Sequence, residues 1–235
     1  MKAVIGGTGF AEFDDLTDIT GNVVKTSFGD AYLERGTFRG ETMAFVPRHG
    51  HPPRQTPHRI NYRANIQALS DIGADSIIAV NAVGGVDASL DVPSLVIPDQ
   101  IIDYTSGREH TFFQGEIQHI DFTYPFDQAL RDQLIAATGS VGNATHKGVY
   151  GCTQGPRLET AAEIERLRRD GCDIVGMTAM PEAALARERE IPYASLCVVV
   201  NQGAGFNDAP VALDEIGAAL EEGMQCVREV FRSLV

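Results

Sequence analysis

The sequence has no tryptophan, few basic residues and no long apolar run. Its 19 Lys and Arg residues face 32 Asp and Glu residues, so the formal net charge is -13 at pH 7. Nucleic-acid-binding proteins normally carry a basic stripe, and we therefore expect no nucleic-acid partner. No apolar run approaches the roughly 20 residues that a membrane-spanning helix needs, so we expect no membrane partner. Any anion site in this chain must be built locally, against the overall field.

Cysteine is scarce, and its four copies, Cys152, Cys172, Cys197 and Cys226, form no CxxC motif. A zinc site needs a tighter cluster of ligands. We predict free thiols, three of them in apolar strand or helix contexts, in a protein of the reducing cytoplasm. The first strand is predicted to begin at Lys2, so we expect neither a signal peptide nor a transit peptide.

The length and the hydrophobic pattern predict one α/β domain over residues 1–235. Of these residues 43% are hydrophobic, which is enough to bury a substantial core. After an early hairpin region at residues 22–47, strand-like runs alternate with helical periodicity. This alternation predicts a three-layer fold with a mixed, mainly parallel sheet flanked by helices. We expect further strands at 1–5, 76–80, 95–97, 173–175 and 193–200, and helices at 59–72, 126–137, 160–170, 181–190 and 213–234.

Glycine-rich and polar segments come at the ends of four of these strands, at residues 6–9, 81–85, 177–178 and 201–205. Sites in α/β folds gather where strands end at their carboxyl side, so we expect these segments to meet as loops.

Two segments indicate an anion site. Gly6-Gly7-Thr8-Gly9 can present backbone N–H groups and a hydroxyl, although a plain tight turn explains it about as well. The second is Pro47-Arg48-His49-Gly50-His51, in which Arg48 offers a planar fork of donors that matches phosphate and His49 offers another donor. The alternative for this segment is a surface basic pair beside a turn.

The remaining segments are weaker when each is taken alone. Small residues around Ala82 let a ligand approach the backbone, or serve a turn. Glu159 is a candidate ligand, or an acid that favours a helix N-terminus. Met177 and Thr178 precede a helix, where a methionine is usually core filler. Asn201 needs partners if it is buried, or is an ordinary residue at a strand end.

Taken together, these segments resemble the purine nucleoside phosphorylase and methylthioadenosine phosphorylase family. The resemblance covers most of the chain in the right order. The matching pieces are VIGGTGF at 4–10, PRHGH at 47–51, HRINYRANIQAL at 58–69, VNAVGG at 80–85, PDQIIDYTSGR at 98–108, TQGPRLET at 153–160, GMTAMPEAALARE at 176–188 and the strand that ends in Asn201.

The resemblance implies a phosphorylase fold, a homotrimer with its site at a subunit boundary, no metal and no cofactor other than phosphate as co-substrate. By position it implies phosphate ligands and substrate-binding residues. The phosphate set is Thr8, Arg48, His49 and Thr178 with the backbone of Ala82, and the catalytic set is Asn201, Arg48 and His49. The substrate set is Met177 under the sugar, Glu159 and Asn201 at the base, Gly203, Leu213, and His119 from a neighbouring subunit.

The same positions predict the substrate. Methylthioadenosine phosphorylases of this family typically carry an aspartate where this chain has Asn201. Asn201 can donate to the six-position oxygen of a 6-oxopurine, and Glu159 can accept from its N1–H. Family members that bind a 5′-hydroxyl usually carry a late histidine, whereas this chain has no histidine after His146 and reads Ala209-Pro210-Val211-Ala212-Leu213 in that region. An apolar region suits a 5′-methylthio group. We therefore expect phosphorolysis of methylthioinosine, as in the bacterial S-methyl-5′-thioinosine phosphorylases that the chain most resembles.

Three alternatives stay open at this point. The chain could be a methylthioadenosine phosphorylase or a general purine nucleoside phosphorylase. It could be a non-catalytic purine-binding protein, although all four phosphate-binding side chains are present. It could also be a nucleoside hydrolase, which would have no use for a phosphate site.

Overall fold

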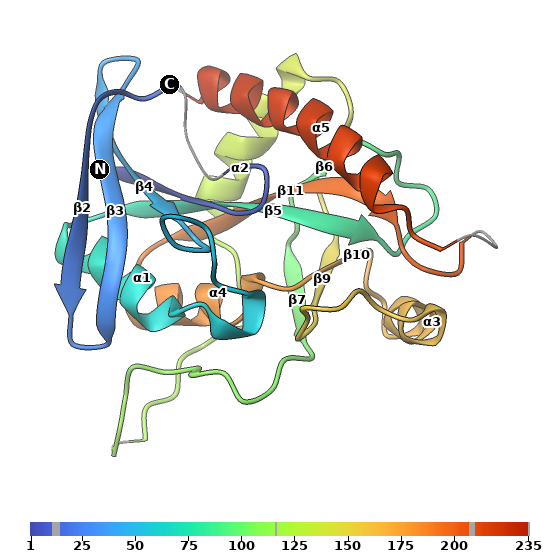
Figure 1. Ribbon diagram of the computed structural model, residues 1–235, viewed down its shortest axis with the longest axis horizontal. Coiled ribbons are helices and arrows are strands. Elements are labelled where there is room, and N and C mark those ends of the chain that lie inside the picture. Colours follow the sequence, from blue (N-terminus) through green and yellow to red (C-terminus); the bar gives the residue numbers. More distant parts are fainter. Residues whose placement is uncertain (11–14, 116, 207–209, 235) are drawn as a thin grey trace.

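The computed structural model describes residues 1–10, 15–115, 117–206 and 210–234 (Figure 1). The strands are β1 (Lys2–Gly6), β2 (Thr17–Thr26), β3 (Gly29–Phe38), β4 (Glu41–Pro47), β5 (Ser76–Gly85), β6 (Ser94–Val96), β7 (Gln100–Asp103), β8 (Ala144–Thr145), β9 (Val149–Cys152), β10 (Ile174–Gly176) and β11 (Tyr193–Gln202). The α-helices are α1 (Tyr62–Asp71), α2 (Gln128–Ala137), α3 (Ala161–Arg169), α4 (Ala179–Glu188) and α5 (Leu213–Ser233). Short 3-10 turns cover Pro57–Arg59 and Thr138–Ser140.

All of these described strands belong to one mixed sheet. Its main path runs β2-β3-β4-β1-β5-β10-β9-β7, and β11 pairs with both β5 and β6. The central pairs β4–β1, β1–β5 and β5–β11 are parallel, and antiparallel pairing is found in the β2–β3–β4 meander and where β10 meets β5. The predicted mixed, mainly parallel sheet is confirmed.

Helices cover both faces of the sheet, so the fold has three layers (Figure 1). Alternate residues of a strand point to opposite faces, and the two main core clusters follow this rule. Ile77 and Ala79 of β5 pack with α1 and α4, whereas Ile78 and Val80 pack with α2 and α5. The central strands are apolar throughout because both of their faces are covered.

Two features of the sheet differ from the sequence-based expectation. Residues 81–85 do not form a loop but continue β5, because β11 pairs with them along one edge and β10 pairs with Gly84 and Gly85 along the other. The short strands β7, β8 and β9 were not predicted from the hydrophobic pattern. Strands of two to four residues carry too few alternations to give a reliable periodic signal, so among the described strands of this length only β6 and β10 were expected.

Helix boundaries agree with the expectation to within about three residues. The predicted helix at 59–72 is shorter, because Pro57–Arg59 form a 3-10 turn and Asn61 caps α1 by accepting from the Ala64 N–H. The predicted helix at 160–170 corresponds to α3, whose Thr160 and Glu163 form a capping box. In the part of the chain that the structure describes, no helix is long and apolar enough to cross a membrane.

Candidate active site

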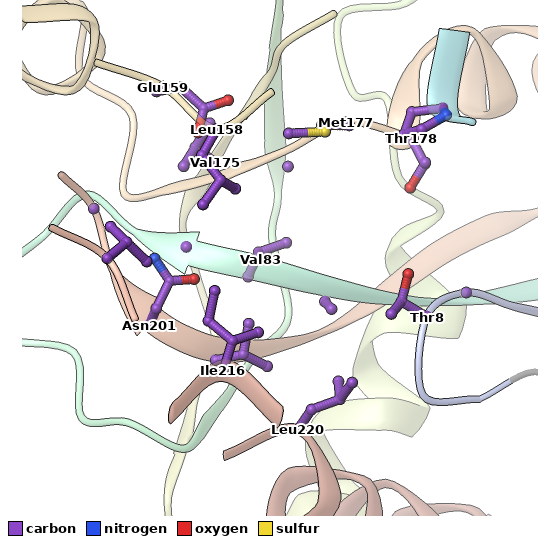
Figure 2. Close-up of a pocket in the computed structure, with 18 of the residues that line it drawn as sticks. Thr8, Val83, Leu158, Glu159, Val175, Met177, Thr178, Asn201, Ile216 and Leu220 are labelled. Carbon is purple, nitrogen blue, oxygen red and sulfur yellow. The ribbon is translucent and has the colours of Figure 1, made fainter. Parts of the chain in front are cut away.

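A cavity of about 190 Å³ lies where the turn after β1, the segment after β4 and the ends of β5, β10 and β11 converge (Figure 2). We call it the substrate cavity. Figure 2 shows Glu159, Leu158 and Val175 at one end, Thr8 and Thr178 at the other, and Ile216 and Leu220 along a side. The predicted residues in its lining are Thr8, Arg48, His49, Ala82, Glu159, Met177, Thr178, Asn201 and Gly203.

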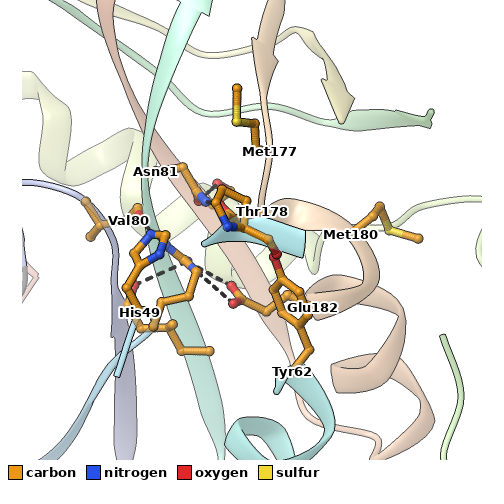
Figure 3. Close-up of polar contacts among 12 residues, drawn as sticks. His49, Tyr62, Val80, Asn81, Met177, Thr178, Met180 and Glu182 are labelled. Carbon is orange, nitrogen blue, oxygen red and sulfur yellow. Dashed lines mark hydrogen bonds and ion pairs between the residues drawn. The ribbon is translucent and has the colours of Figure 1, made fainter. Parts of the chain in front are cut away.

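Arg48 lines the substrate cavity together with Thr8 and forms a buried ion pair with Glu182. Dashed lines in Figure 3 mark the contacts that end at the Glu182 carboxylate. The Arg48 side chain is 1% exposed, and its Nε and Nη2 donate to the two carboxylate oxygens of Glu182 at 2.7 and 2.8 Å. Burial disfavours a charged guanidinium, but the Glu182 carboxylate outweighs this and holds the pKa of Arg48 above its ordinary value. The fork that the sequence assigned to phosphate is therefore occupied by Glu182.

The Nη1 group of Arg48 is the part that reaches the glycine turn. It donates one hydrogen to the Val80 carbonyl oxygen at 2.8 Å. A guanidinium Nη nitrogen carries two hydrogens, so the second can be donated to a ligand. A Cβ atom at Gly7 would lie 2.6 Å from Nη1, so this approach requires glycine. Arg48 thus offers an anion one oriented donor, while Glu182 balances its positive charge.

His49 is held in one tautomer. Its Nδ1 lies 2.7 Å from the Gln55 carbonyl oxygen, which can only accept, so Nδ1 carries the hydrogen. Burial is the main cause that lowers the pKa of His49 below its ordinary value of 6.5, and the neighbouring Arg48 adds to this. A neutral His49 therefore presents the lone pair of Nε2, which accepts from a P–O–H group rather than donating to phosphate.

Thr178 is oriented by a chain of buried hydrogen bonds. The Ser195 hydroxyl donates to Asn81 Oδ1 at 2.7 Å, and Asn81 Nδ2 donates to Thr178 Oγ1 at 2.8 Å. All three residues are buried. Because Thr178 Oγ1 accepts from Asn81, its own hydrogen is available to donate to a phosphate oxygen.

The opposite end of the cavity has groups that can recognise a base. Thr153 Oγ1 donates to Glu159 Oε1 at 2.6 Å, which leaves Oε2 to accept from a ligand. Asn201 lies at a β-bulge near the end of β11, where the register with β5 shifts. One N–H of its amide donates to the Gln202 carbonyl oxygen at 2.8 Å, and the amide retains a second donor and an acceptor oxygen.

An apolar wall joins the two ends. Met177 follows β10, and Val211 precedes α5. Ile216 and Leu220 lie four residues apart, so they share one face of α5. The wall offers no hydrogen-bonding side chain along these four residues, so it suits an apolar substituent.

Two predicted residues do not reach the cavity, and one position lies outside the described residues. Leu213 begins α5 and is 73% exposed, because the helix turns Ile216 and Leu220 inward instead. His119 is exposed in the segment between β7 and α2. Ala209 of the predicted apolar region lies outside the described residues.

Sequence reasoning did not find Glu182 and Ser195 as partners of the site, and it did not find that Asn81 is hydrogen-bonded to Thr178. Their residue types gave one signal, because an acid in an apolar helix segment and polar residues in buried strands must find partners. The structure also contains no group of three or more His, Cys, Asp or Glu within the described ranges that could hold a metal ion. The four cysteines are free, and burial raises the pKa of the Cys152 and Cys197 thiols to about 12.

The sequence matches the Phosphorylase superfamily over residues 2–235. It is 50% identical, over 97% of this chain and 95% of the other, to a protein of Pseudomonas syringae pv. tomato named as a probable S-methyl-5′-thioinosine phosphorylase. It is 42% identical, over 91% and 84% of the two chains, to the 6-oxopurine nucleoside phosphorylase of Pyrococcus furiosus.

Among solved structures, the fold is similar to methylthioadenosine phosphorylase from Schistosoma mansoni in complex with adenine. The TM-score is 0.94 at 29% identity, over 99% of this chain and 89% of the other. The substrate cavity has hydrogen-bonding side chains at both ends and an apolar wall between them, which suits a nucleoside and an anion. The chain belongs to the phosphorylase superfamily and is an enzyme of the purine nucleoside phosphorylase type.

Proposed function

We propose that the chain catalyses the phosphorolysis of S-methyl-5′-thioinosine to hypoxanthine and 5-methylthioribose 1-phosphate. One observation carries the proposal. Thr8, Arg48 and Thr178 line one end of a single cavity, which we call the phosphate end. Glu159 and Asn201 line the other end, which we call the base end, and an apolar wall lies between the two. Relatives named for methylthioinosine and for 6-oxopurine nucleosides support the same class of substrate.

The base end favours a 6-oxopurine. The Glu159 carboxylate accepts from the N1–H that such a base carries, and the Asn201 amide donates to its six-position oxygen. An adenine-type base has no N1–H, so Glu159 would face an acceptor. Polar groups left unpaired in a binding site reduce kcat/KM by several powers of ten.

The apolar wall favours a methylthio group over a hydroxyl at the 5′ position of the sugar. Val211, Ile216 and Leu220 supply the apolar wall, and a buried hydroxyl beside them would lack a partner. Met177 packs under the ribose in this proposal.

In the proposed reaction, a phosphate oxygen forms a bond to C1′ while the bond from C1′ to N9 breaks. The electron pair goes to the base, and N7 takes up a proton in exchange for the one that hydrogen phosphate loses when it becomes an ester. The Asn201 amide oxygen accepts a hydrogen bond from N7–H. The sugar becomes cationic as the bond breaks, and the phosphate held by Thr8, Thr178 and Arg48 stabilises this charge. Holding the two reactants in one cavity also removes much of the entropic barrier.

We also propose that the protein acts in the cytoplasm as a homotrimer. It needs no cofactor, and inorganic phosphate is its co-substrate. His119 then serves a neighbouring subunit near the 5′ end of the sugar. Its exposed position, and an Ile117 side chain that is 88% exposed two residues earlier, support a contact between subunits in this segment.

The test is turnover of methylthioinosine, methylthioadenosine and inosine, each measured with and without phosphate. We expect phosphate-dependent release of hypoxanthine, with the highest kcat/KM for methylthioinosine. Free methylthioribose in phosphate-free buffer would indicate a hydrolase instead. Binding of the nucleoside without cleavage in either buffer would indicate a non-catalytic purine-binding protein.

The second candidate is a methylthioadenosine phosphorylase, which the similarity to the Schistosoma structure favours. Asn201→Asp separates the two, because a carboxylate accepts from a 6-amino group but cannot donate to a 6-oxo group. We expect the ratio of kcat/KM for methylthioinosine to that for methylthioadenosine to fall by about tenfold or more. If both constants fell while their ratio stayed the same, the assignment of the base end would be wrong.

A further inference from the structure

A second cavity, of about 390 Å³, lies on the other side of the phosphate end. We call it the entry cavity. It is lined by the glycine turn at residues 6–9 and by the segment at residues 47–50 and 53–56. It shares Gly7, Thr8, Arg48 and His49 with the substrate cavity, but Glu159, Asn201 and Met177 do not line it. The two cavities therefore meet only at the groups that face phosphate.

The mouth of the entry cavity is open to solvent and positively charged. Residues 53–56 are exposed, and Arg54 is among them. Residues 42–70 contain no Asp or Glu in a chain that has 32 of them. Of the arginines in this stretch, Arg48 pairs with Glu182 and Arg63 with Glu109, whereas Arg54 makes no ion pair with any residue in the described part of the chain. Its charge is thus available to an incoming anion.

The wall of the entry cavity is held in place by its own backbone. The N–H groups of Arg54 and Gln55 donate to the His49 carbonyl oxygen at 2.9 and 3.0 Å, and the Gly50 N–H donates to the Pro47 carbonyl oxygen at 2.9 Å. The His51 ring stacks on Tyr32 of β3 with 4.4 Å between centroids. The opening is therefore formed by a folded segment that the sheet supports.

We propose that the entry cavity is the site through which inorganic phosphate enters, and that Arg54 attracts the anion into it. Phosphate then reaches Thr8 and Arg48 while a nucleoside fills the substrate cavity. The overall charge of -13 repels phosphate. A positively charged mouth therefore raises the rate of phosphate capture more than it would in a neutral protein. This inference rests on the proposed function, because it needs phosphate as the second substrate.

The test is an isotope-trapping experiment. Enzyme preloaded with labelled methylthioinosine is mixed with phosphate and a large excess of unlabelled nucleoside, and the labelled product is counted after one turnover. We expect the bound label to be converted, with a fraction that rises with phosphate concentration. If no label were trapped at any phosphate concentration, nucleoside would have to leave before phosphate enters, and the proposal would be overturned.

Arg54→Glu tests the role of the charge, and Lys25→Glu is its matched control. Lys25 is exposed on β2, lines neither cavity, and its replacement changes the net charge by the same amount. At low ionic strength we expect Arg54→Glu to raise the phosphate concentration for half-trapping by about 3- to 10-fold and Lys25→Glu to leave it nearly unchanged. The difference should shrink near 1 M salt, where the Debye length is about 3 Å. Equal effects of the two variants would rule out steering by Arg54.

Pro53→Trp tests the route, with Pro53→Ala as the control for loss of the proline. The indole should obstruct the entry cavity and lower trapping in nucleoside-loaded enzyme, while enzyme preloaded with phosphate still converts added nucleoside. This second readout shows that the variant has folded. Trapping that matches the wild type in Pro53→Trp would exclude this route. Failure of the proposed function has a different signature, which is no phosphate-dependent cleavage by the wild type at all.

Discussion

At the scale of single residues, the proposed phosphate end depends on a cation that is itself buried. Arg48 keeps its charge because Glu182, which is 0% exposed, accepts two of its hydrogen bonds. The Tyr193 hydroxyl donates to the same carboxylate at 2.9 Å. Removing one member of such a pair leaves the other charge without a partner in a medium that solvates it poorly.

Glu182→Gln should therefore destabilise the protein by about 3–5 kcal/mol and raise the KM for phosphate. Urea denaturation and phosphate titration measure the two effects. Glu165→Gln is the control, since Glu165 forms exposed ion pairs on α3 with Arg168 and Arg169, and such pairs contribute about 0–1 kcal/mol. Similar losses in the two variants would contradict a special role for the buried pair.

His49 should make stability depend on pH. Because burial lowers its pKa below 6.5, the unfolded chain binds more protons than the folded chain as the pH falls through this range. The free energy of unfolding then rises with pH. The stability that the neutral His49 ring contributes is fully present above about pH 6.5 and is lost on acidification. The free energy of unfolding of wild type minus that of His49→Asn should be smaller at about pH 5.5 than at about pH 7.5. A difference that grows on acidification would mean that the folded protein favours the charged ring.

At the scale of elements, Arg108 holds together two segments, one of which carries Met177 of the substrate cavity. It follows β7 and donates to the carbonyl oxygens of Met177 at 2.8 Å, of Met180 at 2.6 Å and of Gln154 at 2.9 Å. The start of α4 and the segment after β9 are thus held by one planar group, which a lysine ammonium cannot imitate.

Arg108→Lys should raise the KM for nucleoside by about tenfold, because small displacements of positioning groups have large effects on rates. Arg131→Lys is the control, since Arg131 donates to the carbonyl oxygens of Pro98 and His146, away from both the cavity and the segment that carries His119. Steady-state kinetics with each substrate varied in turn measures both variants. If Arg131→Lys had the same effect, Arg108 would act on general stability rather than on the position of Met177.

Prediction from sequence succeeded best for long elements. The helix that became α5 and the apolar run of β11 have enough residues to show their periodicity. Small residues and glycines usually indicate a loop, as predicted for residues 81–85, but pairing with β10 and β11 makes them part of β5. Leu213 is predicted in the site but does not line the cavity, because a sequence shows that a segment is apolar and not which of its side chains turn inward.

At the scale of the whole molecule, the proposed trimer makes a site from two chains. A mixture of His119→Ala with Asn201→Ala tests this directly, because each variant alone lacks one part of every site. Random assembly should restore an intact pair in about a quarter of the sites, since half of the subunits carry Asn201 and half of their neighbours carry His119. The mixture is refolded together and its activity is compared with the sum of the separate variants. No gain over that sum, in a mixture shown by native mass spectrometry to contain hybrids, would exclude a shared site.

The sequence by itself determined the fold class and the chemical types in the site. Apolar periodicity and the order of the motifs are local properties, so they can be read along one chain. Only the tertiary structure decided which groups became partners. It assigned the fork of Arg48 to Glu182, 134 positions away, and it linked Ser195 through Asn81 to Thr178. The physical reason is that a buried polar group must find a partner in space, and its distance along the chain does not limit that choice.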